Sequence, residues 1–475
     1  MKTNMRIGII AEGTYPYITG GVSSWIQTLI SNLPEFEFEI YHLRPDSKKR
    51  EVRYKIPKNV VRVHEVNIFG DFDPDISEKA DLSMLDTITD VIVKNRSLEE
   101  LVSILENFIE KNAGKSFSKI FSSKEFWNLV VKTYRNFFSH RGFTEYYWVI
   151  RNLILPIVNS LNFVPEKCDI FHVPSTGYAS LVGVVGKFLY NVPLIITEHG
   201  IYHREREREI IISKWLPEDY KTMWINLFRA ISMIAYNTCD SLTTLFKKNQ
   251  LFQLELGADP KKMVIIPNGV DVDKFDMPKE KHEGFIIGFV GRVTRIKDVK
   301  TAIRSIRVVK DVLRNKKIKF LIIGPTDEEQ DYYEECKKLS KNLFLEDVVE
   351  FLGRQNVREY YPKLDLLLLS SVSEGQPLVI LEAMAAGVPI VATDVGACKE
   401  MVYDEEGQCG IIVPPKNHIM MAKAILKLYE DAELRKVFSQ NAKKIVRKKY
   451  RLDLMIKRYR DLYLHLVRGQ TALKT

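Results

Sequence analysis

Residues 373–396 read SEGQPLVILEAMAAGVPIVATDVG, and this stretch decides the fold of the second half of the chain. A loop with small residues leads into the helical pattern LEAMAAG, and the apolar run at 390–392 then predicts a strand. Glu374 lies in the loop, and Glu382 follows it inside the helix after seven intervening residues. The two carboxylates therefore straddle a helix N-terminus, whose free N–H groups and positive dipole end suit a phosphate or a hydroxylated ligand.

Apolar runs separated by helix-length intervals surround this stretch. Strands that alternate with helices predict a doubly wound parallel sheet, in which ligands bind at the carboxyl ends of the strands. We expect Glu374 at such an end. The predicted strands are 285–290, 319–323, 348–351, 366–369, 390–392 and 410–413.

The first half of the chain shows the same alternation. An apolar run at 6–11 ends in a glycine-containing loop, and helical periodicity over 21–33 leads to a second run at 38–43. This pattern predicts a second Rossmann-like sheet, although the first loop lacks the GxGxxG motif. Further predicted strands are 169–173, 194–197, 241–245 and 264–266.

Residues from about 70 to 161 interrupt this alternation, because they are helical in pattern and rich in aromatic side chains. We predict a helical insertion in the N-terminal domain. The rings can pack the insertion onto its own domain or form an exposed platform for saccharides, and we favour packing, although both can hold for different rings. The rings are Phe126, Trp127, Tyr134, Phe137, Phe138, Tyr146, Tyr147 and Trp148.

The length of the chain predicts two domains, because single cores stop growing at roughly 250–300 residues and this chain has 475. The charged stretch MPKEKHEG at 277–284 is typical of an interdomain linker. We therefore predict an α/β protein with an N-terminal domain over 1–276 and a C-terminal domain over 285–445, facing across a cleft. A basic helix over 446–475 is expected to pack back toward the N-terminal domain, its charges facing water or, alternatively, anionic lipid.

The composition excludes several classes of function. The formal charge of +9 is modest, and no basic and aromatic pattern of a nucleic-acid-binding module occurs, so nucleic acid is not an expected partner. The positive excess would suit a phosphorylated substrate, an acidic polymer or an anionic membrane surface. Cys168, Cys239, Cys336, Cys398 and Cys409 are scattered without a CxxC pair, which argues against a disulfide framework and a zinc site.

The apolar stretches do not resemble targeting or membrane segments. The run at the N-terminus is too short for the core of a signal peptide and is interrupted by Glu12. The stretch 173–197 contains Gly177, Gly183, Gly186 and Pro193, which predict a strand end, a small-residue helix and a second strand rather than a membrane span. We therefore expect a cytoplasmic protein.

Further candidate residues follow predicted strands. Arg292 and Lys297 come directly after the strand at 285–290, where the alternative to a functional role is a surface salt bridge. Gly20 and Gly21 lie at a predicted helix N-terminus, where glycine lets the backbone approach a phosphate, although a plain tight turn would also account for them. His199 ends the strand LIITEHG.

The segment from Glu374 to Glu382 resembles the EX7E signature of retaining GT-B glycosyltransferases of family 4, also called group 1. The resemblance covers almost the whole chain, and the GRxxxxK pattern at Arg292 and Lys297 belongs to it. It implies that Glu374 contacts hydroxyls of the donor sugar, that Glu382 holds the ribose, and that the two cations neutralise the donor diphosphate as the leaving group departs.

The resemblance also implies roles for other residues. The loop with Gly20 and Gly21 is expected near the donor phosphates and the acceptor, and His199 is expected to contact the donor hexose at the reacting centre. His199, Glu374, Arg292 and Lys297 are the implied catalytic residues. Further implied donor-binding residues are Gly375, Gln376, Pro377 and Leu378 beside Glu374, and Gly353 and Arg354 near the base.

The segments EGTYPYITGGVSSW, TEHGIYHRERE and SEGQPLVILEAM look closer still to the PelF-type subgroup, which acts in the synthesis of the Pel exopolysaccharide. In this chain EGQP replaces the usual EGFG, and GPTDEE replaces a glycine-rich turn, which leaves the residue nearest the nucleotide there undefined. The subgroup implies a UDP-sugar donor, membrane-embedded synthase subunits as partners and a place at the inner face of the membrane. Tyr202, Arg204 and Arg206 are acceptor candidates, although we favour loop anchoring by ion pairs for this Arg/Glu run.

The expected activity is transfer of a hexose, from UDP-glucose or a UDP-N-acetylhexosamine, onto a saccharide acceptor with retention of configuration. No cofactor and no metal are implied, because Arg292 and Lys297 supply positive charge. One alternative is a catalytically silent sugar-nucleotide-binding scaffold of a membrane polysaccharide synthase. The presence of all four motif residues, Arg292, Lys297, Glu374 and Glu382, counts against it. Another is a related GT-B epimerase or phosphorylase, which the EX7E segment and the lack of a pyridoxal-phosphate lysine disfavour.

Overall fold

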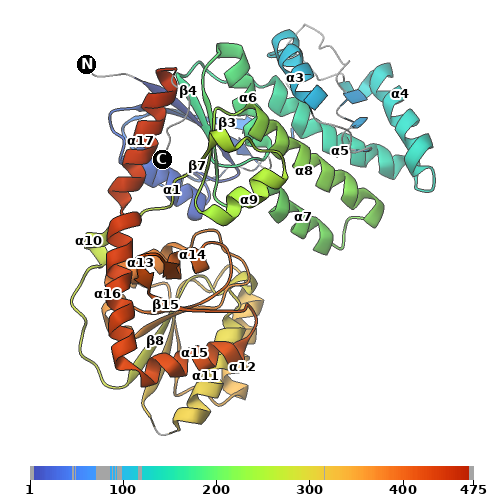
Figure 1. Ribbon diagram of the computed structural model, residues 1–475. Coiled ribbons are helices and arrows are strands. Elements are labelled where there is room, and N and C mark those ends of the chain that lie inside the picture. Colours follow the sequence, from blue (N-terminus) through green and yellow to red (C-terminus); the bar gives the residue numbers. More distant parts are fainter. Residues whose placement is uncertain are drawn as a thin grey trace. The chain divides into compact units, whose positions relative to one another are not determined.

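The computed structural model describes residues 5–44, 46, 48, 50–70, 86, 87, 89, 90, 93, 99–115, 120–314 and 316–469. The chain forms two compact units. Unit 1 comprises Met1–Ile265 and Tyr459–Thr475, and unit 2 comprises Ile266–Arg458. Each unit contains a sheet with helices packed against it (Figure 1).

Unit 1 is built on a sheet of seven strands within the described residues, and every neighbouring pair is parallel. The order across the sheet is β3-β2-β1-β4-β5-β6-β7, so the direction of winding reverses between β1 and β4. That reversal is the switch point at which open α/β sheets bind ligands. The strands are β1 (Arg6–Glu12), β2 (Glu37–Arg44), β3 (Val60–Asn67), β4 (Ile170–Val173), β5 (Leu194–Glu198), β6 (Ser241–Thr244) and β7 (Met263–Ile265).

The helices of unit 1 bury apolar faces against this sheet. The first nine residues of α6 (Tyr178–Tyr190) are all buried. A Cβ atom added at Gly186 of this helix would lie 2.4 Å from Phe171 of β4, so glycine permits a close approach between helix and strand. The other helices are α1 (Gly21–Ser31), α7 (Tyr202–Ile212), α8 (Glu218–Thr238), α9 (Lys247–Glu255) and the second half of α17 (Leu452–Val467).

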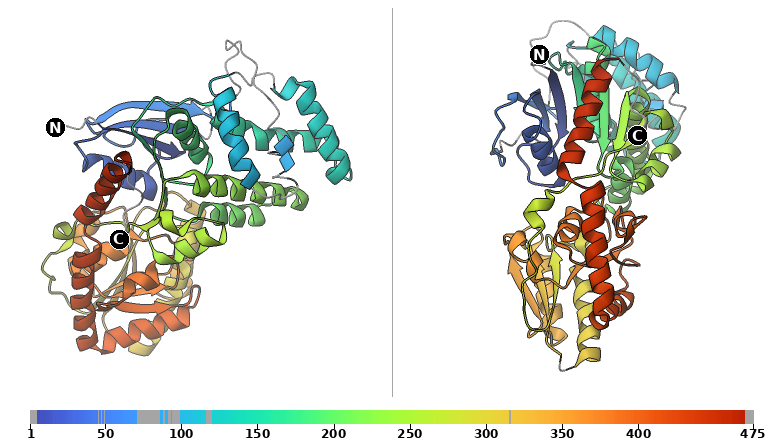
Figure 2. Two further views of the ribbon diagram at one scale, coloured as in Figure 1. Left: turned by 45° about the horizontal axis from the view of Figure 1, so that its top comes forward. Right: turned by 60° about the vertical axis from the view of Figure 1, so that its left-hand side comes forward.

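In the sequence, further helices lie between β3 and β4, where we predict the insertion. Residues 71–85, 94–98 and 116–119 of that span lie outside the described residues. The helices are α3 (Glu99–Asn112), α4 (Lys124–Thr133) and α5 (Phe143–Asn162), and Figures 1 and 2 show α3 and α4 outside the sheet. Phe126 and Tyr146 are fully buried, whereas Trp127 and Trp148 are each 51% exposed. Five of the eight aromatic side chains are thus buried or half-buried among the helices, and Trp127, Phe137 and Trp148 reach the surface.

Unit 2 contains a second parallel sheet, with the order β10-β9-β8-β11-β12-β15 in its described residues. The winding reverses between β8 and β11. The strands are β8 (Phe285–Val290), β9 (Ile318–Ile323), β10 (Val349–Gly353), β11 (Leu366–Leu369), β12 (Ile390–Thr393) and β15 (Gly410–Val413), and β13 (Tyr403–Asp404) with β14 (Gly407–Gln408) forms a small hairpin. The helices are α10 (Val272–Phe275), α11 (Val299–Leu313), α12 (Gln330–Asn342), α13 (Leu378–Ala386), α14 (Cys398–Val402), α15 (His418–Glu430) and α16 (Ala432–Lys449).

The basic residues near the C-terminus are largely held in ion pairs. On α16, Lys443 and Arg447 pair with Asp276, and Lys444 and Lys448 pair with Glu406. These pairs supply carboxylate partners from elsewhere in unit 2, as expected of a charged helix face exposed to water. These four cations of α16 are therefore paired rather than free.

Two further findings concern the apolar and thiol-bearing residues. In the described part of the chain, no helix is both long and apolar enough to cross a membrane, and residues 173–197 form the end of β4, α6 and β5. All five cysteines are buried and free.

Candidate active site

The carboxyl ends of β8 and β11 bring two predicted site residues into direct contact. Lys297 follows β8, Glu374 follows β11, and Nζ of Lys297 donates a hydrogen bond to Oε1 of Glu374 at 2.5 Å. The side chains are only 18% and 10% exposed. Because the strand order reverses between β8 and β11, this ion pair lies at the switch point of unit 2.

Neighbouring contacts join the two loops that carry this pair. The Ser371 hydroxyl donates to Oε1 of Glu374 at 2.6 Å, and the Ser370 hydroxyl donates to the carbonyl oxygen of Lys297 at 2.9 Å. The Val372 N–H donates to the carbonyl oxygen of Ile296 at 2.9 Å. A carboxylate has about four lone-pair sites, so Glu374 can accept further bonds from a hydroxylated ligand while these contacts persist.

Glu382 lies within α13 against a buried tyrosine. The hydroxyl of Tyr361, which is 1% exposed, donates to Oε2 of Glu382 at 2.7 Å. Burial raises the pKa of Glu382 to about 7, and the hydrogen bond from Tyr361 opposes this rise only in part. The carboxyl group therefore titrates near neutral pH.

Arg292 contacts neither glutamate of the EX7E segment in the structure. Its Nη1 atom donates to both carboxylate oxygens of Glu328 at 2.6 Å, and the two side chains are 52% and 48% exposed. The surface salt bridge that we considered as an alternative for Arg292 is thus the contact that this side chain makes. Lys297 is also paired, but with Glu374.

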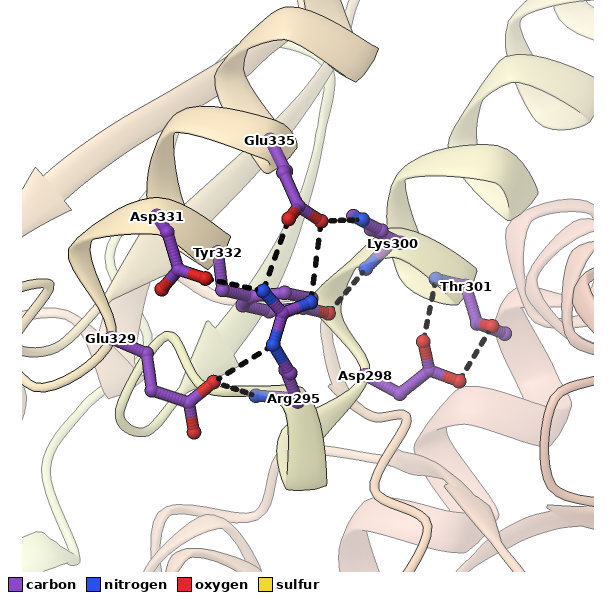
Figure 3. Close-up of polar contacts among 8 residues, drawn as sticks. All are labelled: Arg295, Asp298, Lys300, Thr301, Glu329, Asp331, Tyr332 and Glu335. Atoms are coloured by element: carbon purple, nitrogen blue, oxygen red, sulfur yellow. Dashed lines mark hydrogen bonds and ion pairs between the residues drawn. The ribbon is translucent and has the colours of Figure 1, made fainter. Parts of the chain in front are cut away.

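Arg295 lies between these two cations in the sequence and fixes the loop that carries them. Its guanidinium lies over the ring of Tyr332 and among the carboxylates of Glu329, Asp331 and Glu335 (Figure 3). Lys300 also donates to Glu335 and, together with Arg295, lowers the pKa of that carboxyl to about 2. These contacts tie the loop to the start of α12.

The residues after Glu374 make structural contacts within unit 2. Oε1 of Gln376, a buried side chain, accepts a hydrogen bond from the N–H of Asn268 at 2.6 Å. Pro377 occupies the N-cap position of α13, and Leu378, 37% exposed, begins the helix; Gly375 accepts a backbone bond from Ala397 at 2.9 Å. The amide of Gln376 therefore fixes the loop, and an approach of this backbone to a donor stays a prediction.

Gly353 and Arg354 lie at the other side of the unit 2 sheet. Gly353 ends β10, which β9 separates from β8. Its φ is 65°, and its carbonyl oxygen accepts from the N–H of Gly324 at 2.8 Å. Arg354 follows it and is exposed. The structure thus places these predicted base neighbours two strands away from the Lys297–Glu374 pair.

In unit 1, Gly20 and Gly21 lie at the N-terminus of α1 and are exposed. The backbone of Gly20 is extended, and a Cβ atom at either position would meet no protein atom within 4 Å. The fold therefore does not require glycine at either position, and a tight turn does not explain them.

His199 follows β5 and packs against Trp25, with ring centroids 4.7 Å apart and an edge-on geometry. Burial lowers the pKa of His199 to about 4, so the imidazole is neutral at pH 7. Its Nε2 atom has no hydrogen-bond partner among the described residues. A neutral histidine with an unfilled ring nitrogen can bind one further polar group.

The acceptor candidates on α7 are already engaged within unit 1. The Tyr202 hydroxyl donates to Oε1 of Glu12 at 2.8 Å, and the Arg204 guanidinium lies 3.9 Å from the centre of the Phe252 ring. Arg206 pairs with Glu209 at 2.9 Å. These contacts agree with the anchoring role that we favoured for the Arg/Glu run.

Two carboxylates at strand ends of unit 1, the half-buried Glu12 and the buried Glu198, are absent from the sequence-based prediction. Glu12 ends β1, and Glu198 ends β5, where it accepts hydrogen bonds from Thr176, Tyr236 and Gln253 at 2.6–2.8 Å. Burial raises the pKa of both carboxyl groups. A charged residue as the last member of an otherwise apolar strand was the available signal. In the described ranges, no group of three or more metal-ligating side chains is arranged to hold a metal ion.

Comparison with known families agrees with this geometry. Residues 272–445, which contain Arg292, Lys297, Glu374 and Glu382, match the family described as Glycosyl transferases group 1. This part of the chain belongs to the group 1 glycosyltransferases. Residues 5–261, more than half of the chain, match DUF3492, described as a domain of unknown function, and the chain belongs to that family. The expected enzyme class, a transferase, is confirmed by the family that residues 272–445 match and by the glycosyltransferases among the relatives.

Individual relatives of the glycosyltransferase share part of its length. N-acetyl-alpha-D-glucosaminyl L-malate synthase of Bacillus anthracis is 33% identical over 180 residues, which are 37% of this chain and 44% of the relative. The chain thus spans less than half the length of that relative. UDP-Gal:alpha-D-GlcNAc-diphosphoundecaprenol alpha-1,3-galactosyltransferase of Escherichia coli is 25% identical over 327 residues, 64% of this chain and 76% of the relative.

Solved structures confirm the fold class of the glycosyltransferase. The crystal structure of Anabaena HepE in complex with UDP superposes with a TM-score of 0.62 at 15% identity, and the match covers 97% of this chain and 100% of HepE. Two Rossmann-like parallel sheets, the predicted GT-B architecture, are therefore shared along the whole chain.

Proposed function

We propose that this glycosyltransferase moves a hexose or an N-acetylhexosamine from a UDP-sugar onto a saccharide acceptor, with retention of anomeric configuration. The observation that carries the proposal is the Lys297–Glu374 ion pair at the switch point of the unit 2 sheet. A cation and a carboxylate held together there offer one group for a phosphate and one for sugar hydroxyls.

The UDP donor has separate support. The E. coli relative is named as a galactosyltransferase that uses UDP-Gal, and HepE was crystallised with UDP. Glu382 and Tyr361 lie in the same unit as the Lys297–Glu374 pair, and a carboxylate that accepts two bonds suits the adjacent hydroxyls of a ribose. We assign Glu382 to the ribose and Glu374 to the donor sugar.

The chemistry that we assign needs no metal ion. The bond between the anomeric carbon and the β-phosphate oxygen breaks, and the bond to the acceptor oxygen forms on the same face. The acceptor proton passes to the departing phosphate, whose growing negative charge Arg292 and Lys297 stabilise. His199, neutral at pH 7, positions a sugar hydroxyl in this scheme.

The biological setting that we propose is exopolysaccharide synthesis of the Pel type. The support is the likeness of EGTYPYITGGVSSW, TEHGIYHRERE and SEGQPLVILEAM to that subgroup. In this setting the partners are membrane-embedded synthase subunits, and the protein works at the inner face of the membrane.

A donor screen tests the proposal. The purified chain is incubated with UDP-, GDP- and ADP-sugars, and its thermal stability and turnover are measured with a panel of saccharide acceptors. We expect stabilisation and transfer with a UDP-sugar, and NMR of the new linkage should show retained configuration. Stabilisation by GDP- or ADP-sugars but not by UDP-sugars would overturn the donor assignment, and an inverted linkage would overturn retention.

A further inference from the structure

The carboxylate of Glu328 is bound to the guanidinium of Arg292, the group that we assign to the donor diphosphate. We propose that Glu328 competes with the ligand for Arg292 and weakens binding of the nucleoside diphosphate product more than binding of the nucleoside diphosphate-sugar. This inference rests on the function proposed above. It makes Glu328 a residue that discriminates between donor and product.

The contact between Arg292 and Glu328 is built into the backbone. The N–H of Gly291 donates to the carbonyl oxygen of Ile323, and that of Val293 donates to Pro325, each at 2.9 Å. A Cβ atom at Gly324, where φ is 150°, would lie 2.0 Å from the carbonyl oxygen of Gly291, so only glycine allows the two loops to approach this closely. The loop with Glu328 is thus fastened beside the loop with Arg292.

A second set of contacts joins the two loops after Arg292 and Glu328 in the sequence. The N–H of Arg295 donates to a carboxylate oxygen of Glu329 at 3.1 Å, and the Arg295 side chain reaches into α12 (Figure 3). Because both loops are held before and after the Arg292–Glu328 contact, the backbone offers little room for separation. A ligand therefore frees Arg292 by displacing the Glu328 side chain, which is half exposed and can rotate into water.

The charges of this region show why the competition matters. Arg292 and Lys297 are matched by Glu328 and Glu374, and Arg295 and Lys300 face three carboxylates, those of Glu329, Asp331 and Glu335. Four cations thus meet five carboxylates, and the candidate diphosphate site carries no positive excess before a ligand arrives.

The nucleoside diphosphate product carries more negative charge than the nucleoside diphosphate-sugar, so the Glu328 carboxylate opposes its binding more strongly. A terminal phosphate with a second pKa of about 6 carries nearly one more negative charge at pH 7 than the same phosphate esterified to a sugar. Repulsion from Glu328 therefore grows when the sugar has left. The carboxylate lowers product affinity and shortens product residence.

Calorimetric titration of UDP tests the inference with three variants. In Glu328→Gln, UDP should bind about fivefold more tightly, the upper range for an exposed ion pair, and a UDP-sugar only about twofold more tightly. Asp327→Asn removes the same charge from the neighbouring residue and should change UDP affinity by less than about twofold. In the Arg292→Met background the competition is absent and only the direct repulsion remains, so Glu328→Gln should tighten UDP binding by less than it does in the wild-type background.

The outcomes separate this inference from the proposed function. Unchanged or weaker UDP binding in Glu328→Gln would overturn the role of Glu328, and so would an equal gain for UDP and UDP-sugar or an equal gain in Asp327→Asn. If instead neither the wild type nor Glu328→Gln binds UDP or a UDP-sugar, the proposed donor class fails first, and the inference falls with it.

Discussion

The sheets of unit 1 and unit 2 share one strand order over six strands, but the side chains at their switch points differ in charge. In unit 1, Glu12 ends β1 and accepts from the Ala179 N–H at 3.1 Å and from the Tyr202 hydroxyl, and burial raises its pKa. In unit 2, Lys297 and Glu374 form an ion pair. One fold thus holds a hydrogen-bonded carboxyl group at one switch point and an ion pair at the other, which suits the two different substrates of the transfer that we propose.

The largest expected effect lies at the charged switch point. Replacement Lys297→Ala removes the cation that we assign to the leaving phosphate and leaves Glu374 without its ion-pair partner, so kcat/KM for transfer should fall by about 10²- to 10³-fold. Lys310→Ala, which breaks a pair with Asp347 on the same unit, serves as the control and should leave kcat/KM near the wild-type value. Transfer by Lys297→Ala within threefold of the wild type would remove the charged site from the mechanism.

Glu382 should make donor binding depend on pH. Its pKa of about 7 means that roughly one tenth of the carboxyl is ionised at pH 6 and nine tenths at pH 8, so affinity for a UDP-sugar should rise about tenfold over that range. In our assignment, the ionised form is the one that accepts bonds from both ribose hydroxyls. Glu382→Gln should bind with little pH dependence, and a wild-type affinity that is flat between pH 6 and 8 contradicts the assignment.

The same carboxyl group should affect stability with the opposite sign. Its pKa is higher in the folded chain than the ordinary value of 4.5, so between pH 4.5 and pH 7 the folded state binds more protons than the unfolded state. The stability contributed by Glu382 is therefore present at low pH and is lost as the pH rises through 7. Thermal unfolding should show Glu382→Gln gaining on the wild type from pH 5 to pH 8.

A smaller effect is expected from Arg295, which we regard as a positioning residue. Arg295→Gln loosens the loop that carries Arg292 and Lys297, and the donor KM should rise about three- to fivefold, the scale of an exposed ion-pair network. Arg295→Lys keeps the charge and should recover part of the loss. An unchanged donor KM together with a lowered melting temperature would mean that Arg295 only stabilises the fold.

The smallest effect on transfer is expected at the switch point of unit 1. Tyr202→Phe removes the hydrogen bond to Glu12 and should lower the free energy of unfolding by about 1 kcal/mol, seen as a fall in Tm. Acceptor KM should stay within about twofold if Tyr202 anchors α7. A tenfold rise in acceptor KM at unchanged stability would instead place the acceptor at this tyrosine.

The strands were predictable because most are apolar runs buried on both faces. The predicted ranges 285–290, 366–369 and 410–413 coincide with β8, β11 and β15. Strand β3 is absent from the predicted set, because VVRVHEVN lies at the sheet edge and its side chains are mostly exposed or half-buried. An edge strand has one neighbour and needs no continuous apolar pattern.

Sequence motifs indicate individual candidate residues of the site, but they do not indicate which side chains those residues contact. Motifs identified Arg292 and Glu382, whereas their partners Glu328 and Tyr361 come from loops 36 and 21 residues away in sequence. Those partners depend on how β9 and β11 are placed in the sheet, which no local pattern encodes. The role of Gln376 was missed for the same reason, because its bond to Asn268 spans 108 residues.

The buried cysteines offer a way to watch the two units separately. Cys168 and Cys239 lie in unit 1, Cys336, Cys398 and Cys409 lie in unit 2, and burial raises the pKa of every one of these thiols. A protonated, enclosed thiol reacts slowly with alkylating reagents until the chain around it opens. Pulsed alkylation followed by peptide mass mapping would therefore time the opening of each sheet without any added label.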